Sequence, residues 1–252
     1  MAVSNIFHCC VQKTASQWIK AILSDELVLN RAAMWFYSYQ KEFPGKIDLR
    51  RLHERNFSSP FPPHTIASPL YLDFHSYNSI PKAESHKTFF VRRDPRDIVV
   101  SWYYSVCYSH KPIGRIPEHR KKLLEMSLAD GLIYSIAYLK DYGIFGALLS
   151  WLEKPAPDPH AITFTYEEIT DPNQQESQFA KLFAHCEIDL SKEEIGFLLC
   201  KYRFANLKNA TAQKPFSHYR KGKAGDWADH FTPAVCDFFL HETGDLLSRL
   251  GY

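Results

Sequence analysis

The sequence lacks a strong charge of either sign. Its 252 residues carry 30 lysines and arginines against 28 aspartates and glutamates, which leaves a formal net charge of +2. A balance this close to zero gives no global field that would favour nucleic acid or a membrane surface as a partner. Any site for an anion must therefore be local and built from a few cations.

Long apolar runs are also missing. No segment approaches the ~20 consecutive apolar residues that a membrane-spanning helix needs. The first residues, MAVSNIFHCCVQK, have neither a basic start nor an extended apolar stretch, so they do not resemble a secretory signal. We therefore expect no membrane insertion.

Paired cysteines are lacking as well. The chain has six cysteines without a C-x-x-C pair, and they stand in apolar surroundings. This pattern favours buried free thiols over disulfides or zinc ligands, and hence a reducing, cytoplasmic compartment. The histidines show no H-E-x-x-H or comparable spacing, so we predict no metal site. The six cysteines are Cys9, Cys10, Cys107, Cys186, Cys200 and Cys236.

The apolar residues that are present favour an α/β fold. They make up 45% of the chain, enough to fill the core of one large domain over residues 1–252, with two smaller domains as the alternative. Apolar runs of strand length occur at residues 5–11, 70–74, 87–91 and 160–165, with helical patterns between them. This alternation predicts a parallel sheet covered by helices.

The clearest helical pattern follows the residues RRDP. Apolar side chains recur at i, i+3, i+4 and i+7 from Val99 to Val106, and Asp94 before Pro95 is a typical helix start. The pattern of residues 127–153 predicts either one long helix or two helices separated by a break. A further helix is predicted after Pro233. Two segments without a firm pattern are expected to be rich in loops, residues 38–69 and 109–126.

The stretch HCCVQKTASQW, residues 8–18, runs from an apolar strand through a polar turn into a helix. Such a turn presents free backbone N–H groups to an anion, and Lys13, Thr14 and Ser16 add further donors. The nucleoside-triphosphatase loop G-x-x-x-x-G-K-[ST] would require glycine at positions 7 and 12, which this chain lacks. The alternative is an ordinary capped helix with a surface lysine.

Two further stretches carry clustered cations. In FFVRRDPRDIVVSWYYS, residues 89–105, Arg93 closes a strand at the carboxyl edge of the sheet, where such folds bind ligands. The alternative is that these arginines pair with the neighbouring aspartates at the surface. In YRKGKAGDW, residues 219–227, two glycines allow the backbone to approach an anion closely, although a solvated turn has the same composition.

Together, and in this order, the three stretches resemble the cytosolic sulfotransferase family. KTASQW is similar to the family's PKSGTTW loop, RRDPRDIVVSWYYS to its RNPKDxxVSYYHF segment, and YRKGKAGDWADHFT to its RKGxxGDWKNxFT loop. The resemblance implies a three-layer α/β/α fold with a parallel sheet, related to P-loop nucleoside triphosphatases. It also implies transfer of a sulfuryl group from 3′-phosphoadenosine 5′-phosphosulfate (PAPS) to a small molecule's hydroxyl or amine, which leaves adenosine 3′,5′-bisphosphate (PAP).

The resemblance assigns residues to three parts of the donor site. The first loop would grip the 5′-phosphosulfate, and the second and third stretches would surround the 3′-phosphate. Aromatic side chains would contact the adenine, because TYEEITDP is similar to the family's FYEDMKxxP and FANLK to its FxxMK. The implied residues are Lys13, Thr14, Ala15, Ser16 and Gln17 for the phosphosulfate, Arg93, Ser101, Arg220, Lys221 and Gly222 for the 3′-phosphate, and Trp18, Tyr166 and Phe204 for the adenine.

The family also supplies a catalytic expectation. Its KTH triplet carries a histidine general base, and LYLDFHSYNSIP places His75 at the matching position. An imidazole can take up a proton near neutral pH. Lys13 would neutralise the leaving phosphate, and the family's transfer involves no bridging magnesium, so no metal is expected.

The chain departs from the family pattern at several positions. Ala15 replaces a glycine, from which we expect a loop conformation outside the positive-φ region. Asp73 replaces the triplet's lysine, which removes a cation near the sulfuryl group. The family's dimer motif KxxxTVxxxE appears as ADHFTPAVCD without its defining residues, so that dimer is not predicted. A P-loop kinase and a nucleotide-binding protein without catalysis remain as alternatives.

The acceptor pocket is predicted to be lined by the three segments with the weakest helix or strand pattern. These are residues 30–70, 105–130 and 208–219. The basic run at 110–122 is interpreted as a solvated face, with attraction of an anionic acceptor as the alternative. Six aromatic residues suggest either a partly apolar pocket or a hydrophobic subcore. They are Trp35, Phe36, Tyr37, Tyr39, Phe57 and Phe61.

Overall fold

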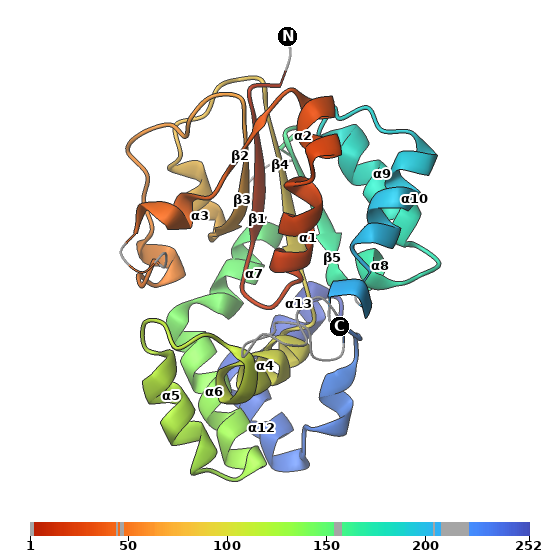
Figure 1. Cartoon of the computed structure of the whole chain (residues 1–252). Helices are drawn as coiled ribbons and strands as arrows, with labels where there is room; N and C mark the ends of the chain where they lie inside the picture. Colours follow the sequence, from red (N-terminus) through yellow and green to blue (C-terminus); the bar gives the residue numbers. More distant parts are fainter. Residues whose placement is uncertain (1–2, 44, 46–47, 154–157, 204, 208–221) are drawn as a thin grey trace.

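The fold is built on a five-stranded parallel sheet, seen edge-on in the centre of Figure 1. The computed structural model describes residues 3–43, 45, 48–153, 158–203, 205–207 and 222–252. The parallel arrangement confirms the sheet predicted from the sequence. The strands in spatial order are β2 (Trp35–Tyr37), β3 (Thr65–Tyr71), β1 (Asn5–Cys10), β4 (His86–Arg92) and β5 (Ala161–Thr165).

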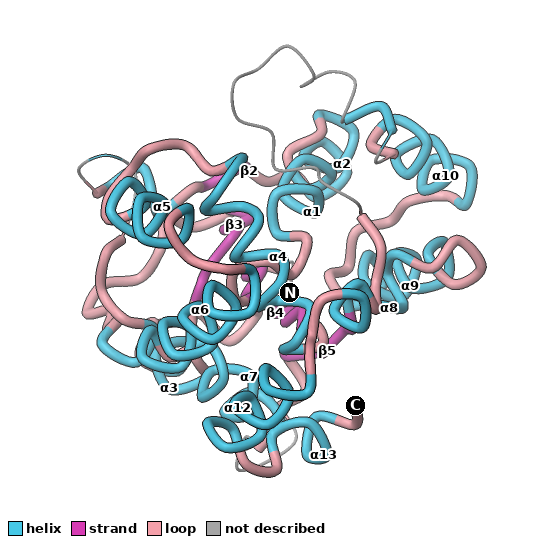
Figure 2. The backbone as a smooth tube through the Cα atoms, turned by 90° about the horizontal axis from the view of Figure 1, so that it is seen from below, coloured by secondary structure: helices cyan, strands magenta, loops and turns pink. Residues whose placement is uncertain are grey.

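Helices cover both faces of this sheet and make three layers, as Figure 2 shows from below. Neighbouring residues of β1 belong to different cores, because Ile6 packs on one face and Phe7 on the other. The first core is closed by α1 (Ser16–Leu23), α2 (Glu26–Ala32), α8 (Tyr166–Thr170), α9 (Gln175–His185) and α10 (Lys192–Lys201). The second is closed by α3 (Phe74–Asn78), α4 (Pro95–Tyr104), α5 (Ile116–Leu124), α6 (Leu128–Tyr142), α7 (Ile144–Leu152), α12 (Pro233–Thr243) and α13 (Leu246–Leu250).

Three of the four predicted strands are confirmed to within one residue, and the strand predicted at 70–74 is wrong. β3 ends at Tyr71, and the side chain of Asp73 accepts a hydrogen bond from the Ser76 backbone N–H at 2.7 Å, which starts α3. The apolar run therefore continues past the end of the strand. The short edge strand β2 was not predicted, since its three consecutive aromatic residues show no alternation.

The helix predicted after Asp94 is confirmed as α4. The Asp94 carboxylate accepts from the Arg96 backbone N–H at 2.9 Å, and Pro95 occupies the first turn. After Tyr104 the helix widens into a π-helical turn, η4 (Ser105–Ser109).

Residues 127–153 form the broken pair of helices, because Gly143 ends α6 with φ 93°. In the described part of the chain, no single helix is long and apolar enough to span a membrane. The pair α6 and α7 reaches that length only jointly, across a 55° bend.

The cysteine and loop predictions are partly wrong. All six cysteines are free and four are buried, but Cys200 is exposed and Cys236 is half-buried on the outer sides of their helices. The segment 109–126 contains α5, in which only His119 and Leu123 are buried, so its amphipathic pattern is weak. The described residues of the segment 38–69 contain most of β3 and the 3₁₀ turns η1 (Tyr39–Glu42) and η3 (Leu52–Glu54).

The bend at Gly143 gives a first testable prediction. Gly143→Ala should lower the free energy of unfolding by about 1–2 kcal/mol, because a left-handed conformation disfavours any side chain. The new methyl group would also lie 3.3 Å from the His53 ring. The matched control is Gly146→Ala in α7, where a methyl group meets nothing within 4 Å and should raise stability by up to ~1 kcal/mol. Urea unfolding of both variants checks the prediction. A change of the same sign in the free energy of unfolding of both variants would contradict it.

Candidate functional site

The turn between β1 and α1 has a strained backbone. Lys13 has φ 71° and Ala15 has φ 62°, and Ala15 is the N-cap residue of α1 without a side-chain cap. The expectation that Ala15 avoids the positive-φ region is therefore wrong. The turn keeps the left-handed geometry that glycine normally supplies, at a cost of about 1–2 kcal/mol for alanine.

The side chains of this turn point in different directions. Lys13, Ala15, Ser16, Gln17 and Trp18 line a common cavity. The Ser16 hydroxyl lies 2.9 Å from the phenol oxygen of Tyr71, at the end of β3, and the Gln17 amide donates to the same oxygen at 3.2 Å.

Thr14, by contrast, is fully buried and lies outside the residues that line the cavity. Its hydroxyl donates to the Val11 carbonyl oxygen at 2.8 Å. The structure therefore does not bring the Thr14 side chain to the predicted anion site.

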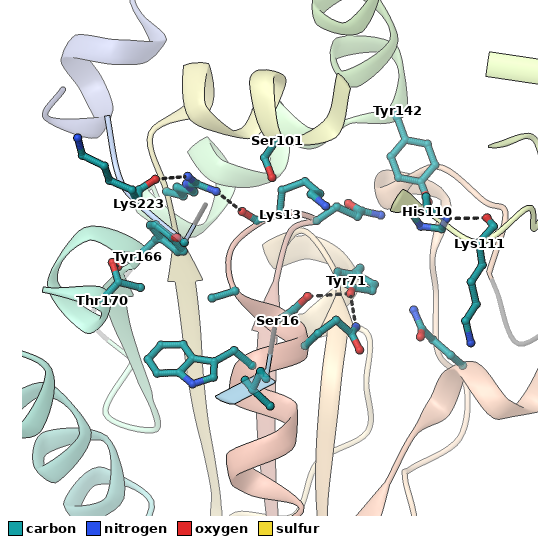
Figure 3. Close-up of a pocket in the computed structure, with 18 of the residues that line it drawn as sticks. Lys13, Ser16, Tyr71, Ser101, His110, Lys111, Tyr142, Tyr166, Thr170 and Lys223 are labelled. Carbon is teal, nitrogen blue, oxygen red and sulfur yellow. Dashed lines mark hydrogen bonds between the residues drawn. The ribbon is translucent and has the colours of Figure 1, made fainter. Parts of the chain in front are cut away.

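The cavity has a volume of about 520 Å³ and lies at the carboxyl ends of the strands. Because β1 is the central strand, one side of this cavity lies toward β4 and β5 and the other toward β3 and β2. Figure 3 shows Tyr166 and Thr170 on the β5 side, His110 and Tyr142 on the opposite side, and Lys13 between them.

Arg93 joins the parts of the site on the β4 side. Its guanidinium donates to the carbonyl oxygens of Lys13 at 3.1 Å and Lys223 at 3.2 Å, and to the Asp97 carboxylate at 3.1 Å. It also lies 3.9 Å from the centre of the Tyr166 ring. The alternative of pairing with neighbouring aspartates is therefore confirmed for Arg93 and Asp97, and Arg96 pairs with Asp94 at 2.7 Å. The surface location in that alternative is wrong for Arg93, which is only 6% exposed.

One donor of this guanidinium has no partner in the part of the chain that the structure describes. This donor is the buried Nε of Arg93. A buried N–H without a partner is costly, so its presence at the wall of a cavity favours a bound anion.

Asp97 holds the last predicted stretch against α4. Its carboxylate, almost fully buried, accepts from the backbone N–H groups of Gly225 at 2.8 Å and Trp227 at 2.9 Å. Gly222 and Ser101 line the cavity beside it. Three predicted residues, Phe204, Arg220 and Lys221, lie outside the described residues.

The two described aromatic residues that were assigned to the adenine, Trp18 and Tyr166, both line the cavity. The Trp18 ring lies edge-on to Phe179 at 5.3 Å, and its Nε1 donates to the Tyr202 carbonyl oxygen at 2.8 Å. Tyr166 is held below Arg93. Further residues of the cavity wall were not singled out from the sequence, because they are spread along helices: Thr170, Gln175, Leu199, Arg203 and Leu207.

The β3 side is polar and centred on Arg55. This residue is 1% exposed and donates to the Asp48 carbonyl oxygen at 3.0 Å, the Tyr71 carbonyl oxygen at 2.6 Å and the Tyr142 hydroxyl at 2.7 Å. Burial alone would raise the pKa of Asp48. Hydrogen bonds from Arg50 and a neighbouring tyrosine, with the charge of Arg55, nevertheless lower that pKa below its ordinary value, so the carboxylate stays ionised.

The prediction of an aromatic pocket is wrong, and the subcore alternative is confirmed for four of the six residues. Tyr37, Tyr39 and Phe57 each pack on Phe61, with ring centres 5.3–6.2 Å apart, and none of the four lines the cavity. Trp35 is 75% exposed on the edge strand. The cavity wall on this side is instead formed by Gln12, Gln40, Asp48, Arg55, Tyr71, His110, Lys111, Ile113 and Tyr142.

The structure does not bring His75 to Lys13. His75 is exposed on α3 and is absent from the cavity wall, because the strand ends at Tyr71 and the cap at Asp73 turns the chain into a helix. The capping pattern of an aspartate three residues before Ser76 was the sequence signal for this turn.

A different histidine, His110, lines the cavity, from the run at 110–122 that was expected to be solvated. The solvated interpretation holds for Lys121 and Lys122, which are exposed on α5. At the beginning of the run Lys111 is also exposed, but together with the half-buried His110 and Ile113 it lines the cavity.

Comparisons with known proteins agree with this architecture. The family model described as the sulfotransferase domain matches residues 3–251. The chain is 28% identical to guinea-pig (Cavia porcellus) 3-beta-hydroxysteroid sulfotransferase over 187 residues, 70% of this chain and 60% of that protein. It is 23% identical to the 3-alpha-hydroxysteroid sulfotransferase of the same species, over 90% of this chain and 78% of that protein.

Solved structures show the same fold. Mouse sulfotransferase SULT7A1, complexed with PAP, superposes with a TM-score of 0.62 at 22% identity, over 96% of this chain and 83% of that chain. Retinol dehydratase, in complex with androsterone and PAP, superposes with a TM-score of 0.57 at 18% identity, over 96% of this chain and 80% of that chain. At these identities the likeness establishes the fold.

The strained turn gives a second prediction. Ala15→Gly should raise the free energy of unfolding by up to ~1 kcal/mol, because glycine removes the left-handed penalty at φ 62°. The matched control is Ala21→Gly inside the same helix, α1, where glycine should lower stability by ~1 kcal/mol. Urea unfolding measures both, and a loss of stability in Ala15→Gly would contradict the left-handed turn.

Proposed function

The chain belongs to the sulfotransferase domain family, and on this premise we propose that it transfers a sulfuryl group from PAPS to a hydroxyl or amine group of a small molecule. One observation carries the proposal: a single cavity is lined by the lysine turn before α1 and by the buried Arg93. Two separate cationic sites suit a nucleotide with phosphates at two positions of its ribose.

The described residues fit such a donor. Lys13, the Ser16 hydroxyl and the backbone N–H groups that begin α1 would hold the 5′-phosphosulfate. Arg93, whose Nε has no partner among the described residues, would hold the 3′-phosphate together with Ser101. Trp18 and Tyr166 would then border the adenine.

The charge of Lys13 gives this site its catalytic effect. During transfer the bond between sulfur and the phosphate oxygen breaks, a bond between sulfur and the acceptor atom forms, and the acceptor loses its proton. Lys13 would lie beside the leaving oxygen, where a fixed positive charge stabilises the negative charge that develops. The hydrogen bonds of Ser16 and Arg93 fix the elements on either side, which favours an in-line geometry.

The polar wall on the β3 side supports a polar acceptor. Asp48, Arg55 and Tyr142 form part of this wall, where Ile113 supplies an apolar surface. These three groups are hydrogen-bonded to one another or to their neighbours, but the buried side-chain oxygen of Gln12 on the same wall has no partner among the described residues. A large apolar molecule would leave that oxygen without a hydrogen bond, which is unfavourable. We therefore expect an acceptor with several hydrogen-bonding groups, in contrast to the hydroxysteroids in the names of two relatives.

Nucleotide binding tests the donor proposal. We expect PAP to bind at least ~100-fold more tightly than ATP, because two added charge-assisted contacts at a separate site contribute about 3 kcal/mol or more. A chelator should change neither binding nor turnover with PAPS. Titration calorimetry with and without EDTA measures this. Equal affinity for ATP, or a requirement for magnesium, would favour the kinase alternative; PAP binding without any transfer would favour the non-catalytic one.

The acceptor prediction is tested with a panel of small molecules. Mass spectrometry should detect products heavier by one sulfuryl group for polar phenols, amino alcohols and sugars. Their kcat/KM should exceed that of a hydroxysteroid by ~10-fold or more, since unmet hydrogen bonds in the wall penalise an apolar acceptor. An equal or higher kcat/KM for the hydroxysteroid would contradict the prediction while leaving the donor site intact.

A further inference from the structure

Gln12 brings an unpaired polar atom to the wall of the cavity. The residue lines the cavity directly after the end of β1. Its side-chain oxygen, Oε1, is buried, and no donor among the described residues pairs with it. A buried carbonyl oxygen without a hydrogen bond is costly, so a donor from a molecule bound in the cavity would be favourable here.

The other polar groups of this wall already have partners. The Tyr71 hydroxyl is hydrogen-bonded by two side chains of α1, and Arg55 donates to three carbonyl oxygens and to the Tyr142 hydroxyl. The Gln12 side chain also contributes a hydrogen bond to Tyr142, which occupies its amide nitrogen. The oxygen is therefore the part of this amide that is left for a bound molecule.

Gln12 and Lys13 are neighbours in the chain, and both line the same cavity. In an extended strand, consecutive side chains would point to opposite faces. Lys13 has φ 71°, so the backbone leaves the extended conformation directly after Gln12. Consecutive Cα atoms are only about 3.8 Å apart. The amide of Gln12 is thus attached beside the residue expected at the leaving oxygen, with Tyr71 and Tyr142 on the same side of the cavity (Figure 3).

The chemistry of the oxygen narrows the group that it can bind. An amide oxygen only accepts, so an ether or a methyl group of the acceptor would leave it unpaired. A protonated amine could donate, but the positive charge of the adjacent Lys13 would repel it. A neutral hydroxyl group meets both conditions.

We propose that Gln12 is a specificity-determining residue that selects acceptors with a second hydroxyl beside the one that is sulfonated, an inference that rests on the proposed function. Catechols and vicinal diols have this arrangement. The second hydroxyl donates to Oε1 of Gln12, while the first faces the sulfuryl group near Lys13. The family loop PKSGTTW has proline at the matching position, which offers no side-chain oxygen, so this selection is a feature of the present chain.

The variant Gln12→Met tests this assignment, because methionine keeps the length of the side chain but has no amide oxygen. In the wild type, kcat/KM for catechol should exceed that for phenol or 2-methoxyphenol by ~10-fold or more. In Gln12→Met this ratio should fall to ~3 or less, mainly through a higher KM for catechol. The kcat/KM for phenol and the affinity for PAP should stay within ~3-fold of the wild type.

Two controls accompany this variant. Gln178→Met makes the same change in α9, away from the residues that line the cavity, and should keep the wild-type ratio. Propane-1,2-diol and propan-1-ol form a second matched pair of acceptors, for which the same loss of preference is expected in Gln12→Met.

The variant Gln12→Glu separates the hydrogen bond from packing. Glutamate keeps a side-chain oxygen, so the preference for catechol over phenol should remain at ~10-fold or more. The added negative charge near the leaving phosphate should lower kcat for both acceptors. Loss of the preference in Gln12→Glu as well as in Gln12→Met would indicate packing and reject the hydrogen bond.

Three outcomes overturn the inference and leave the proposed function standing. They are a wild-type ratio below ~3 in both pairs, a ratio in Gln12→Met equal to that of the wild type, and transfer only to acceptors without an adjacent second hydroxyl. A wild-type protein that binds PAP but transfers no sulfuryl group to any acceptor rejects the proposed function together with the inference.

Discussion

The buried pair of Arg93 and Asp97 connects segments that are far apart in the sequence. Removing two charges from water costs several kcal/mol per ion, so such a pair persists only when further hydrogen bonds offset that cost. Here the carbonyl oxygens of Lys13 and Lys223 accept from the arginine, and two backbone N–H groups donate to the aspartate. The position of the lysine turn relative to α4 therefore depends on this pair.

Local sequence patterns were sufficient to predict those parts of the site that consist of one strand and the helix that follows it. The cap at Asp94 and the spacing of α4 were evident in the sequence, as was the turn before α1. The backbone conformation of Ala15 was not, because a glycine-free sequence suggested an unstrained turn. The β1–α1 connection imposes the left-handed geometry on whichever residue stands there.

For the β3 side of the cavity, the sequence predicted two of the contributing segments, residues 30–70 and 105–130, but not which side chains line it. Arg55, Tyr71 and His110 come from three separate segments and meet only after the sheet has formed. The motif resemblance also favoured His75, whereas the capping interaction at Asp73 carries that residue out to the exposed side of α3. Short-range capping here outweighs an alignment to a family triplet. Gln12 and Tyr71 do lie in stretches with a motif resemblance, but nothing in those motifs indicated that their side chains would meet Asp48 and Arg55.

The hydrogen bonds of Arg55 have a consequence for how the protein discriminates between molecules. Because its donors are satisfied by main-chain carbonyl oxygens and by Tyr142, the wall is ordered before anything enters. A preorganised surface loses little conformational entropy on association, so even a compact guest can be held. The protein then selects a small molecule by how well its polar atoms match the fixed positions of the donors and acceptors in the wall. A larger molecule binds little more tightly if its polar atoms do not match those positions.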